Sequence, residues 1–293
     1  MGWARHGHFL DADAVERGRN FVTPEAWQAA RKRAAWKGVA ERTFENMLSS
    51  QAMCFNVFAP LASRPSLATK VLASQVPGLK RVRSIAFEYT PPADVFKDQS
   101  GRGGVDCDLL VEAEWDDDAV GVIAVETKFV EPEFSRCGFR KAGRKAKGEA
   151  YYCPDTVDVR DDSANCLYER NKGYLYWKRT REHETISQDA VPASGCPFKG
   201  VLWQLWVNHT LAHVEASRRQ ARHARYAVCA PANNDKLLKG GSVIDQFKAL
   251  TTDPQTVLFI DLNELIGSIH RAVGDAPELQ GWAQGIVARY ANI

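Results

Sequence analysis

Acidic and basic side chains stand at matching ends of two apolar runs in the stretch 105–132. The residues there that could do chemistry are Asp106, Asp108, Glu126, Thr127 and Lys128. The two aspartates precede the apolar run 109–111, and the other three residues follow the run 120–125. Each run reads as a buried strand. Because side chains alternate between the faces of a strand, residues two apart, such as Glu126 and Lys128, point the same way.

We expect the two runs to form a hairpin about the acidic turn 115–119. The acidic end of one strand then lies beside the Glu-x-Lys end of the other, in a pocket of two carboxylates and one ammonium group. Such oxygens, with the backbone carbonyl of Thr127, suit a hard cation such as Mg2+ or Mn2+. Metal-assisted phosphodiester hydrolysis also uses a lysine that orients water or neutralises growing charge.

The order acid, apolar strand, turn, apolar strand and Glu-x-Lys resembles the active-site hairpin of the PD-(D/E)XK nuclease superfamily. The tripeptide 126–128 is the only Glu-x-Lys in the chain, and Asp108 opens the preceding strand eighteen residues before Glu126. The resemblance implies that Asp108, Glu126 and the backbone of Thr127 bind Mg2+ and that Lys128 is catalytic. Since no proline precedes either aspartate, Asp106 stays open as the ligand in place of Asp108.

Four further polar residues are candidate supports of this pocket. The segment 49–61, SSQAMCFNVFAPL, resembles the first helix of restriction-endonuclease-like members, which suggests Glu45 and Gln51; a Gln that caps local backbone is the alternative. Gln204 resembles the glutamine that supports the lysine in exonuclease-type members. Glu88, near the end of a strand, either approaches the metal site or pairs with an arginine of its own strand.

Seven cysteines are present, an odd number that does not indicate a disulfide framework. Four of them lie in or beside a polar segment without clear periodicity: Cys137, Cys153, Cys166 and Cys196. Thiolates bind zinc and iron–sulfur clusters, although the Cys-x-x-Cys pairs of a zinc finger are missing here. Some nucleases of the superfamily carry a cysteine-ligated 4Fe–4S cluster, so the resemblance suggests such a cluster or Zn2+. Free thiols are the alternative.

The composition limits where nucleic acid could bind and where the protein acts. The net charge is +2 and the isoelectric point is about 8.1, so a DNA contact has to be local. The basic runs 31–37 and 140–147 are the candidates, with a solvated surface as the alternative. No run of eighteen apolar residues and no signal-peptide pattern occurs, so we expect a soluble, cytoplasmic protein without membrane contact.

The remaining periodicity predicts an α/β fold with a restriction-endonuclease-like mixed sheet flanked by helices. Further strands are expected at 79–89, 225–231 and 256–262. Helices are expected at 12–19, 24–38, 41–60, 66–76, 198–222, 242–250, 262–273 and 278–291. We divide the chain into an N-terminal helical extension, 1–40, and a nuclease-like domain, 41–293, with an irregular cysteine-containing insertion, 133–197. His209 and His213 are read as surface residues.

We therefore expect an Mg2+-dependent phosphodiesterase that cleaves DNA, a deoxyribonuclease of the restriction-endonuclease-like kind. Asp108, Glu126, Lys128 and Gln204 carry the reaction on this interpretation. The alternatives are a module of the same fold that binds nucleic acid without cutting it, and a structural protein built around a cysteine-bound metal. Whether cleavage is internal or from an end is not indicated by the residues.

Overall fold

The computed structural model describes residues 7–36, 38–98, 104–140, 152–274 and 276–291. Its centre is a mixed sheet in which the strands follow chain order. The strands are β1 (Leu79–Tyr89), β2 (Cys107–Trp115), β3 (Val120–Thr127), β4 (His223–Ala230) and β5 (Val257–Asp261). The pairs β1–β2 and β2–β3 are antiparallel, and β3–β4 and β4–β5 are parallel. The predicted mixed α/β sheet is confirmed.

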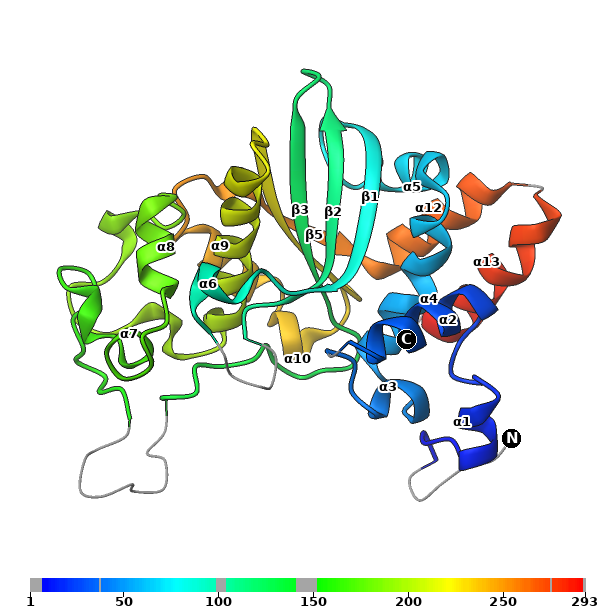
Figure 1. Ribbon diagram of the computed structural model, residues 1–293, viewed down its shortest axis with the longest axis horizontal. Helices are drawn as coiled ribbons and strands as arrows, with labels where there is room; N and C mark the ends of the chain where they lie inside the picture. Colours follow the sequence, from blue (N-terminus) through cyan, green and yellow to red (C-terminus); the bar gives the residue numbers. More distant parts are fainter. Residues whose placement is uncertain (1–6, 37, 99–103, 141–151, 275, 292–293) are drawn as a thin grey trace.

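The hairpin of β2 and β3 stands out beyond the flanking helices (Figure 1). Its register pairs Leu109 with Val125, and the turn closes with a 2.9 Å hydrogen bond from the N–H of Trp115 to the carbonyl of Ala119. Gly121 is required beside this turn, since a Cβ there would lie 2.5 Å from the ring of Trp115. The hairpin therefore has the turn that the sequence predicts.

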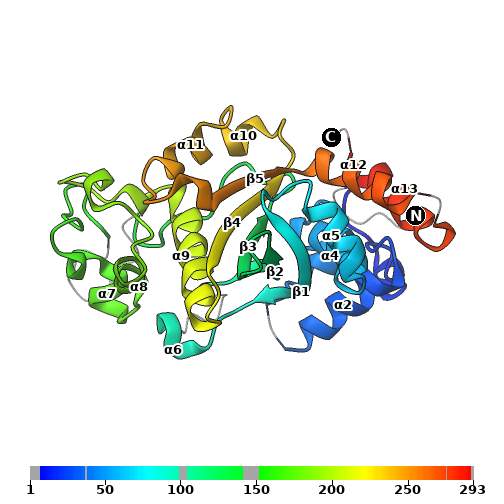
Figure 2. The same ribbon diagram turned by 90° about the horizontal axis from the view of Figure 1, so that it is seen from above.

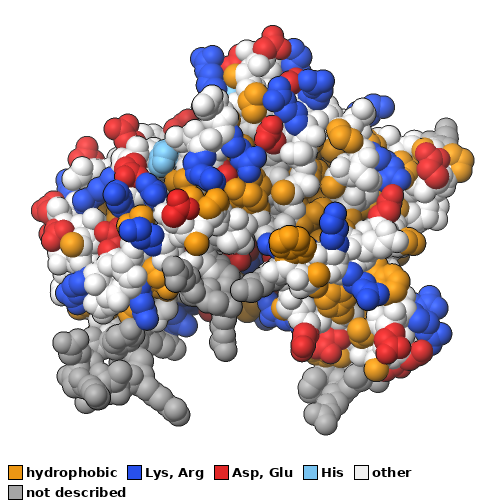
Figure 3. Space-filling view, in the orientation of Figure 1, with side chains coloured by type: hydrophobic (Ala, Val, Ile, Leu, Met, Phe, Trp, Pro, Cys, Tyr) orange, Lys and Arg blue, Asp and Glu red, His pale blue; other side chains and the backbone are white. Residues whose placement is uncertain are grey.

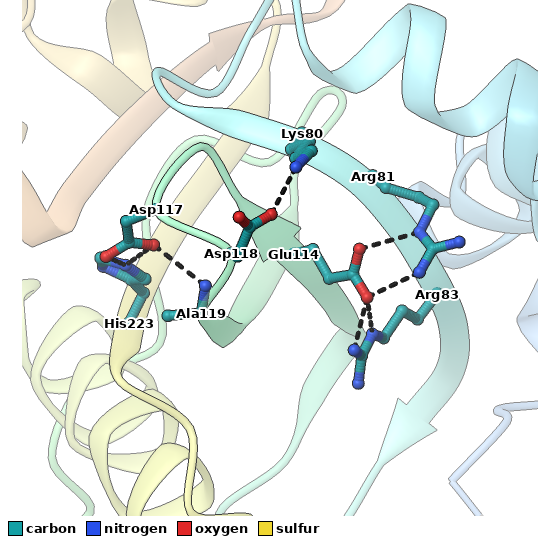
Figure 4. A network of polar contacts seen from close by, with 8 residues as sticks. All are labelled: Lys80, Arg81, Arg83, Glu114, Asp117, Asp118, Ala119 and His223. Atoms are coloured by element: carbon teal, nitrogen blue, oxygen red, sulfur yellow. Dashed lines mark hydrogen bonds and ion pairs between the residues drawn. The ribbon is translucent and has the colours of Figure 1, made fainter.

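Ion pairs tie the tip of the hairpin to its neighbours on both sides (Figure 4). Glu114 of β2 accepts hydrogen bonds from Arg81 and Arg83 of β1. Asp117 in the turn faces His223 of β4 at 3.0 Å. These exposed pairs each add little to stability, but several together fix the register of the strands.

The two faces of the sheet pack against different sets of helices (Figure 2). Alternate residues such as Leu109 and Ile123 share a core with α4 (Ser50–Ala62), α5 (Pro65–Leu72), α12 (Leu262–Val273) and α13 (Pro277–Tyr290). The intervening residues, such as Leu110 and Ala124, pack with α9 (Leu202–Arg218). Both faces of the sheet are thus covered.

The other helices are short. They are α1 (Ala12–Glu16), α2 (Pro24–Ala34), α3 (Arg42–Glu45), α6 (Ala93–Phe96), α7 (Leu167–Lys172), α8 (Tyr176–Glu182), α10 (Asp235–Leu238) and α11 (Ser242–Lys248). Short 3-10 turns occur at η1 (Ser163–Asn165), η2 (Gln188–Ala190), η3 (Pro197–Lys199) and η4 (Pro254–Thr256). In the part of the chain that the structure describes, none of the helices has the length and apolar character needed to cross a membrane.

The helix predicted at 41–60 is wrong in its continuity, because the chain forms two helices there, α3 and α4. Ser49 ends the break between them, and its hydroxyl accepts a 3.3 Å hydrogen bond from the N–H of Ala52. Serine is a favoured N-cap because it satisfies an amide that the helix leaves unpaired. Ser49 therefore marks the start of α4.

A buried asparagine joins both ends of the described chain to α4. Asn56 accepts a 2.7 Å hydrogen bond from the N–H of Val22, and its amide donates to the carbonyl of Asn20 and to the hydroxyl of Tyr290. The indole of Trp282 in α13 donates to the backbone carbonyl of Asn56. One side chain of α4 thus connects the N-terminal helices with the last helix.

The segment 133–197, in which the sequence shows no clear periodicity, contains α7 and α8 and packs against α9. We call it the cysteine lobe. Trp177 and Phe198 contribute to one core with Trp206 of α9, and the rings of Phe198 and Trp206 stack with centroids 4.4 Å apart. Aromatic contacts of this kind hold the cysteine lobe against α9, even though its sequence shows no clear periodicity.

The surface position expected for His209 and His213 is wrong. His209 is 1 % exposed, and its imidazole contacts the hydroxyl of Thr256 at 2.8 Å. His213 is partly buried and lies 3.2 Å from His209, nitrogen to nitrogen. Helix α9 lies between the sheet, the cysteine lobe and α11, so it buries more than one face. Burial lowers the pKa of His213 to about 4.

Candidate active site

Asp108 lies beside the end of β3, at the base of the hairpin. Its Oδ2 accepts hydrogen bonds from both the backbone N–H and the hydroxyl of Thr127, each at 2.6 Å. Burial raises the pKa of this carboxyl, while Lys128 and the two bonds from Thr127 oppose the rise. Thr127 therefore fixes Oδ2 of Asp108, and neither of these two hydrogen bonds uses Oδ1.

Glu126 is held by three donors from two elements. Its Oε1 accepts hydrogen bonds from Lys128 at 2.6 Å and from the Gln204 amide at 2.7 Å, and its Oε2 accepts one from Asn208 at 2.8 Å. Burial raises the pKa of Glu126 to about 8, although Lys128 lowers it. The carboxylate is 5 % exposed and cannot turn without breaking these bonds.

Lys128 is almost as deeply buried as Glu126, since 8 % of its surface is exposed. Burial alone lowers the pKa of a lysine, but the carboxylates of Glu126 and Asp108 more than offset it, so the pKa of Lys128 lies above its ordinary value. Its backbone N–H donates to the carbonyl of Cys229 at 2.9 Å, which continues the pairing of β3 with β4. The ammonium group is thus charged and fixed beside Glu126.

Asp106 and Glu88 bring the number of acidic side chains in this cluster to four, against the single positive charge of Lys128. Burial, followed by the charge of Asp108, raises the pKa of Asp106 to about 7 and that of Glu88 to about 9. Glu88 has a φ of +47°, which is uncommon for a residue other than glycine, and its buried Oε1 lacks a hydrogen-bond partner among the described residues. A buried carboxylate oxygen without a donor is a point where a cation would be favourable.

Gln51 and Glu45 differ in their distance from this cluster. The side chain of Gln51 bonds to Glu88, and it also accepts from the N–H of Ala40 and donates to the carbonyl of Gly38 at 2.8 Å. Gln51 therefore touches the acidic cluster while it caps local backbone. For Glu45, the contact found is with the N-terminal segment, since its backbone carbonyl accepts a 2.8 Å hydrogen bond from the N–H of Leu10.

Two residues near the site were not among the predicted ones. Asn208 follows Gln204 by four positions and so shares its face of α9, a spacing that is readable in the sequence. Glu131 follows the end of β3, where the strand alternation no longer applies. Its Oε1 accepts a 2.5 Å hydrogen bond from Ser50, and its charge contributes to the raised pKa values of Asp108 and Lys128.

The donor set suits a hard divalent cation. The carboxylates of Asp108, Glu126, Asp106 and Glu88 supply the oxygen ligands that Mg2+ prefers, and a carboxylate with one or two hydrogen bonds keeps free lone pairs. Within the described ranges, however, no group of three or more His, Cys, Asp or Glu side chains is arranged to hold a metal ion as it stands. The residues therefore fit the cation in the chemistry of their donor atoms, and both oxygens of Glu126 accept hydrogen bonds in this structure.

The structure brings the four cysteines of the cysteine lobe together. Cys137, Cys153, Cys166 and Cys196 line one small cavity, which also borders α9. Cys54, Cys107 and Cys229 lie instead in the cores beside the sheet. All seven cysteines carry free thiols.

Comparisons with known proteins bear on the fold and the hairpin together. The search of curated proteins gave no match, and the search of solved structures gave none either. The family model of the PD-(D/E)XK nuclease superfamily matches residues 2–153, a range that includes Asp108, Glu126 and Lys128. That range is just over half of the chain; it contains β1, β2 and β3 and ends at Cys153 in the cysteine lobe. The protein belongs to the PD-(D/E)XK nuclease superfamily.

Proposed function

We propose that the protein is a metal-dependent nuclease that hydrolyses phosphodiester bonds of DNA at the base of the β2–β3 hairpin. The observation that carries the proposal is the Glu126–Lys128 pair, buried and held by Gln204 and Asn208 next to Asp108. Membership of a nuclease superfamily supports the reaction class. A buried pair with this many polar supports is costly to maintain and is typical of reactive sites.

Asp108 and Glu126, with the backbone carbonyl of Thr127, are the residues that would hold the cation. When bound, Mg2+ or Mn2+ would supply Lewis-acid stabilisation of the charge that grows on the phosphate. Lys128 contributes a fixed positive charge and N–H donors that orient the attacking water or neutralise a phosphate oxygen. Gln204 keeps Lys128 and Glu126 in position, and its Oε1 is itself held by the N–H of Ser135 at 2.9 Å.

DNA contact on this proposal is local, in keeping with the small net charge. Lysines and arginines gather near the hairpin at the top of Figure 3. A groove of about 960 Å3 between α5 and β1 is lined by Lys70, Lys80, Arg81, Arg83 and Glu114; Lys80 pairs with Asp118, and both arginines pair with Glu114. Lysines and arginines neutralise backbone phosphates without reading sequence. Of the basic run predicted at 140–147, residues 141–147 lie outside the described residues.

The test is a cleavage assay on plasmid, double-stranded and single-stranded DNA, with Mg2+, with Mn2+ and with chelator. Wild type is compared with Glu126→Gln and Lys128→Ala. The matched control is Glu112→Gln, a carboxylate on the same hairpin that pairs with Arg219 at 3.2 Å, away from the pocket. We expect metal-dependent cleavage by wild type and control, and a loss of at least about 100-fold in both pocket variants.

A second candidate function is binding without cleavage. The observation in its favour is that both oxygens of Glu126 already accept hydrogen bonds, as they would in a pocket that never binds a cation. It predicts that wild type shifts DNA in a gel but leaves it uncut with either metal. Equal cleavage by wild type and Glu126→Gln would contradict the nuclease proposal in a different way, because the activity would then lie elsewhere or in a contaminant.

A further inference from the structure

Four cysteines from four separate stretches of chain meet at one point of the cysteine lobe. Cys137, Cys153, Cys166 and Cys196 all line a cavity of about 20 Å3, and the remaining wall is mostly aromatic and aliphatic. The nearest two of these residues are thirteen positions apart in the chain. The fold, and no local sequence motif, therefore gathers four of the seven thiols around one space.

Backbone amides point at three of these four sulfur atoms. The N–H of Phe139 donates to the sulfur of Cys137, the N–H of Phe198 donates to that of Cys196, and Cys166 accepts from two amides of α7. Such donors favour a sulfur that carries negative charge, and hydrogen bonds of this kind surround metal-bound thiolates. These amides oppose the effect of burial, which raises the pKa of Cys137 to about 12 in the apolar cavity.

The other cysteines have a different environment. Burial raises the pKa of Cys229, and the carboxylates of Asp261 and Asp108 raise it further. Nearby acids act in the same direction on Cys107. Around the cysteines of the cavity the charges are mixed, with Lys199 near Cys137 and Cys153 and Asp155 near Cys153. The two groups of cysteines therefore differ in position and in the presence of a nearby lysine.

A metal centre bound in this cavity would lie beside α9, the helix that carries Gln204. Trp203 and Trp206 of α9 form part of its wall, and Gln204, which holds Glu126, lies between them in the chain. Among the described residues of the cysteine lobe, the α-helices next to this wall are α7, with six residues, and α8, with seven. A cross-link among its loops would stabilise the lobe and fix the first turn of α9.

We propose that Cys137, Cys153, Cys166 and Cys196 together bind one metal centre through their thiolates, either a zinc ion or an iron–sulfur cluster. Four sulfur ligands are the set that selects these two kinds of centre. Binding draws the sulfurs inward around the cavity, since the described side chains are not yet arranged to hold an ion. Each thiol gives up its proton to solvent as the metal binds. The centre is separate from the cation of the proposed nuclease site.

Metal analysis of the full-length protein tests this proposal without any DNA. The protein is purified anaerobically, without a polyhistidine tag, and zinc, iron and acid-labile sulfide are measured per chain. We expect about one zinc, or about four irons with equal sulfide and absorbance near 400 nm. The two arms distinguish the two kinds of centre. Wild-type protein that holds neither metal after incubation with Zn2+, and after incubation with Fe2+ and sulfide, overturns the proposal.

Two variants locate the centre. Cys196→Ala is expected to lose most of the bound metal, whereas the matched control Cys229→Ala keeps it. If Cys196→Ala does not fold, a thiol count on wild type answers the same question: four thiols react with a thiol reagent only after a chelator has removed the metal. Metal retained by Cys196→Ala, or lost from Glu126→Gln instead, contradicts the assignment. Because no cleavage is measured, failure here leaves the nuclease proposal untouched.

Discussion

The side-chain amide of Asn208 donates a 2.8 Å hydrogen bond to Oε2 of Glu126, while Lys128 and Gln204 bind the other oxygen of the same carboxylate. The amide from α9 therefore decides which way Glu126 faces. Without it, one oxygen is buried with no donor, which costs about 1–3 kcal/mol. The carboxylate then either turns or takes up a proton.

Replacement of Asn208 by alanine is accordingly expected to lower the cleavage rate about 10-fold or more and to raise the Mg2+ concentration needed for half of the full rate. The measurement is a metal titration of the initial rate. Asn171→Ala, which removes an exposed amide from α7, serves as the control. An Asn208→Ala protein with an unchanged metal titration would mean that Asn208 does not orient Glu126 during the reaction.

The choice between the two aspartates can be made by paired substitutions. Asp108→Asn weakens the negative partner of Thr127 and removes a ligand in the proposed site, so cleavage should fall at least about 100-fold. Asp106→Asn should cost about 10-fold or less, because the hydrogen bonds from Thr127 and Lys128 that fix the proposed ligands go to Asp108 and Glu126. Rates and Mg2+ affinities are measured for both. The reverse order of effects would identify Asp106 as the ligand.

The raised pKa of Glu88 predicts how the stability of the metal-free protein depends on pH. Its pKa is about 9 in the folded protein, above its ordinary value, so the folded state holds a proton that the unfolded state has already released. The contribution of Glu88 is therefore most favourable below pH 4.5 and is lost progressively as the pH rises toward 9.

The variant Glu88→Gln removes this titration. At pH 8 and in chelator it should be more stable than wild type by about 2 kcal/mol, with little difference near pH 4.5. Thermal unfolding across this pH range gives the comparison, with Glu112→Gln as the control for loss of a carboxylate. A stability gap that does not change with pH would show that Glu88 ionises normally.

Replacement of Asn56, which lies outside the candidate active site, is expected to cause a large loss of stability. Asn56→Ala removes the partner of the N–H of Val22 and of the hydroxyl of Tyr290, both of which are held at 2.7 Å. Leaving two buried polar groups unpaired should cost about 2–4 kcal/mol, measured by urea unfolding. Asn171→Ala again provides the exposed control. A loss below about 0.5 kcal/mol would mean that water replaces the asparagine.

The central sheet was accessible from the sequence because its strands carry strong local signals. The runs 109–111 and 120–125 are continuously apolar, as in buried strands, and are separated by an acidic turn. The strand 79–89 has the same bounds in the structure. The helix predicted at 41–60 was less accurate, because a local cap at Ser49 divides one apolar stretch into two helices.

The environment of the candidate site depends on contacts that no local pattern encodes. That Asn208 reaches Glu126 requires knowing that α9 packs on β3, more than seventy residues away in the chain. Spacing placed Asn208 on the face of Gln204 but gave no reason to aim that face at Glu126. The burial of His209 has the same origin, since α9 is covered by neighbours that are distant in sequence.

The parallel pairing of β3 with β4 sets an order of events during synthesis. The residues Asp108, Glu126 and Lys128 leave the ribosome about a hundred residues before β4 is complete, and until then β3 is an unpaired edge that lacks its cover from α9. Exposed strand edges are prone to pair with other chains. During synthesis, the residues of the future site are therefore present for a time without β4 and α9 beside them. A chain truncated near residue 153 would never gain these neighbours.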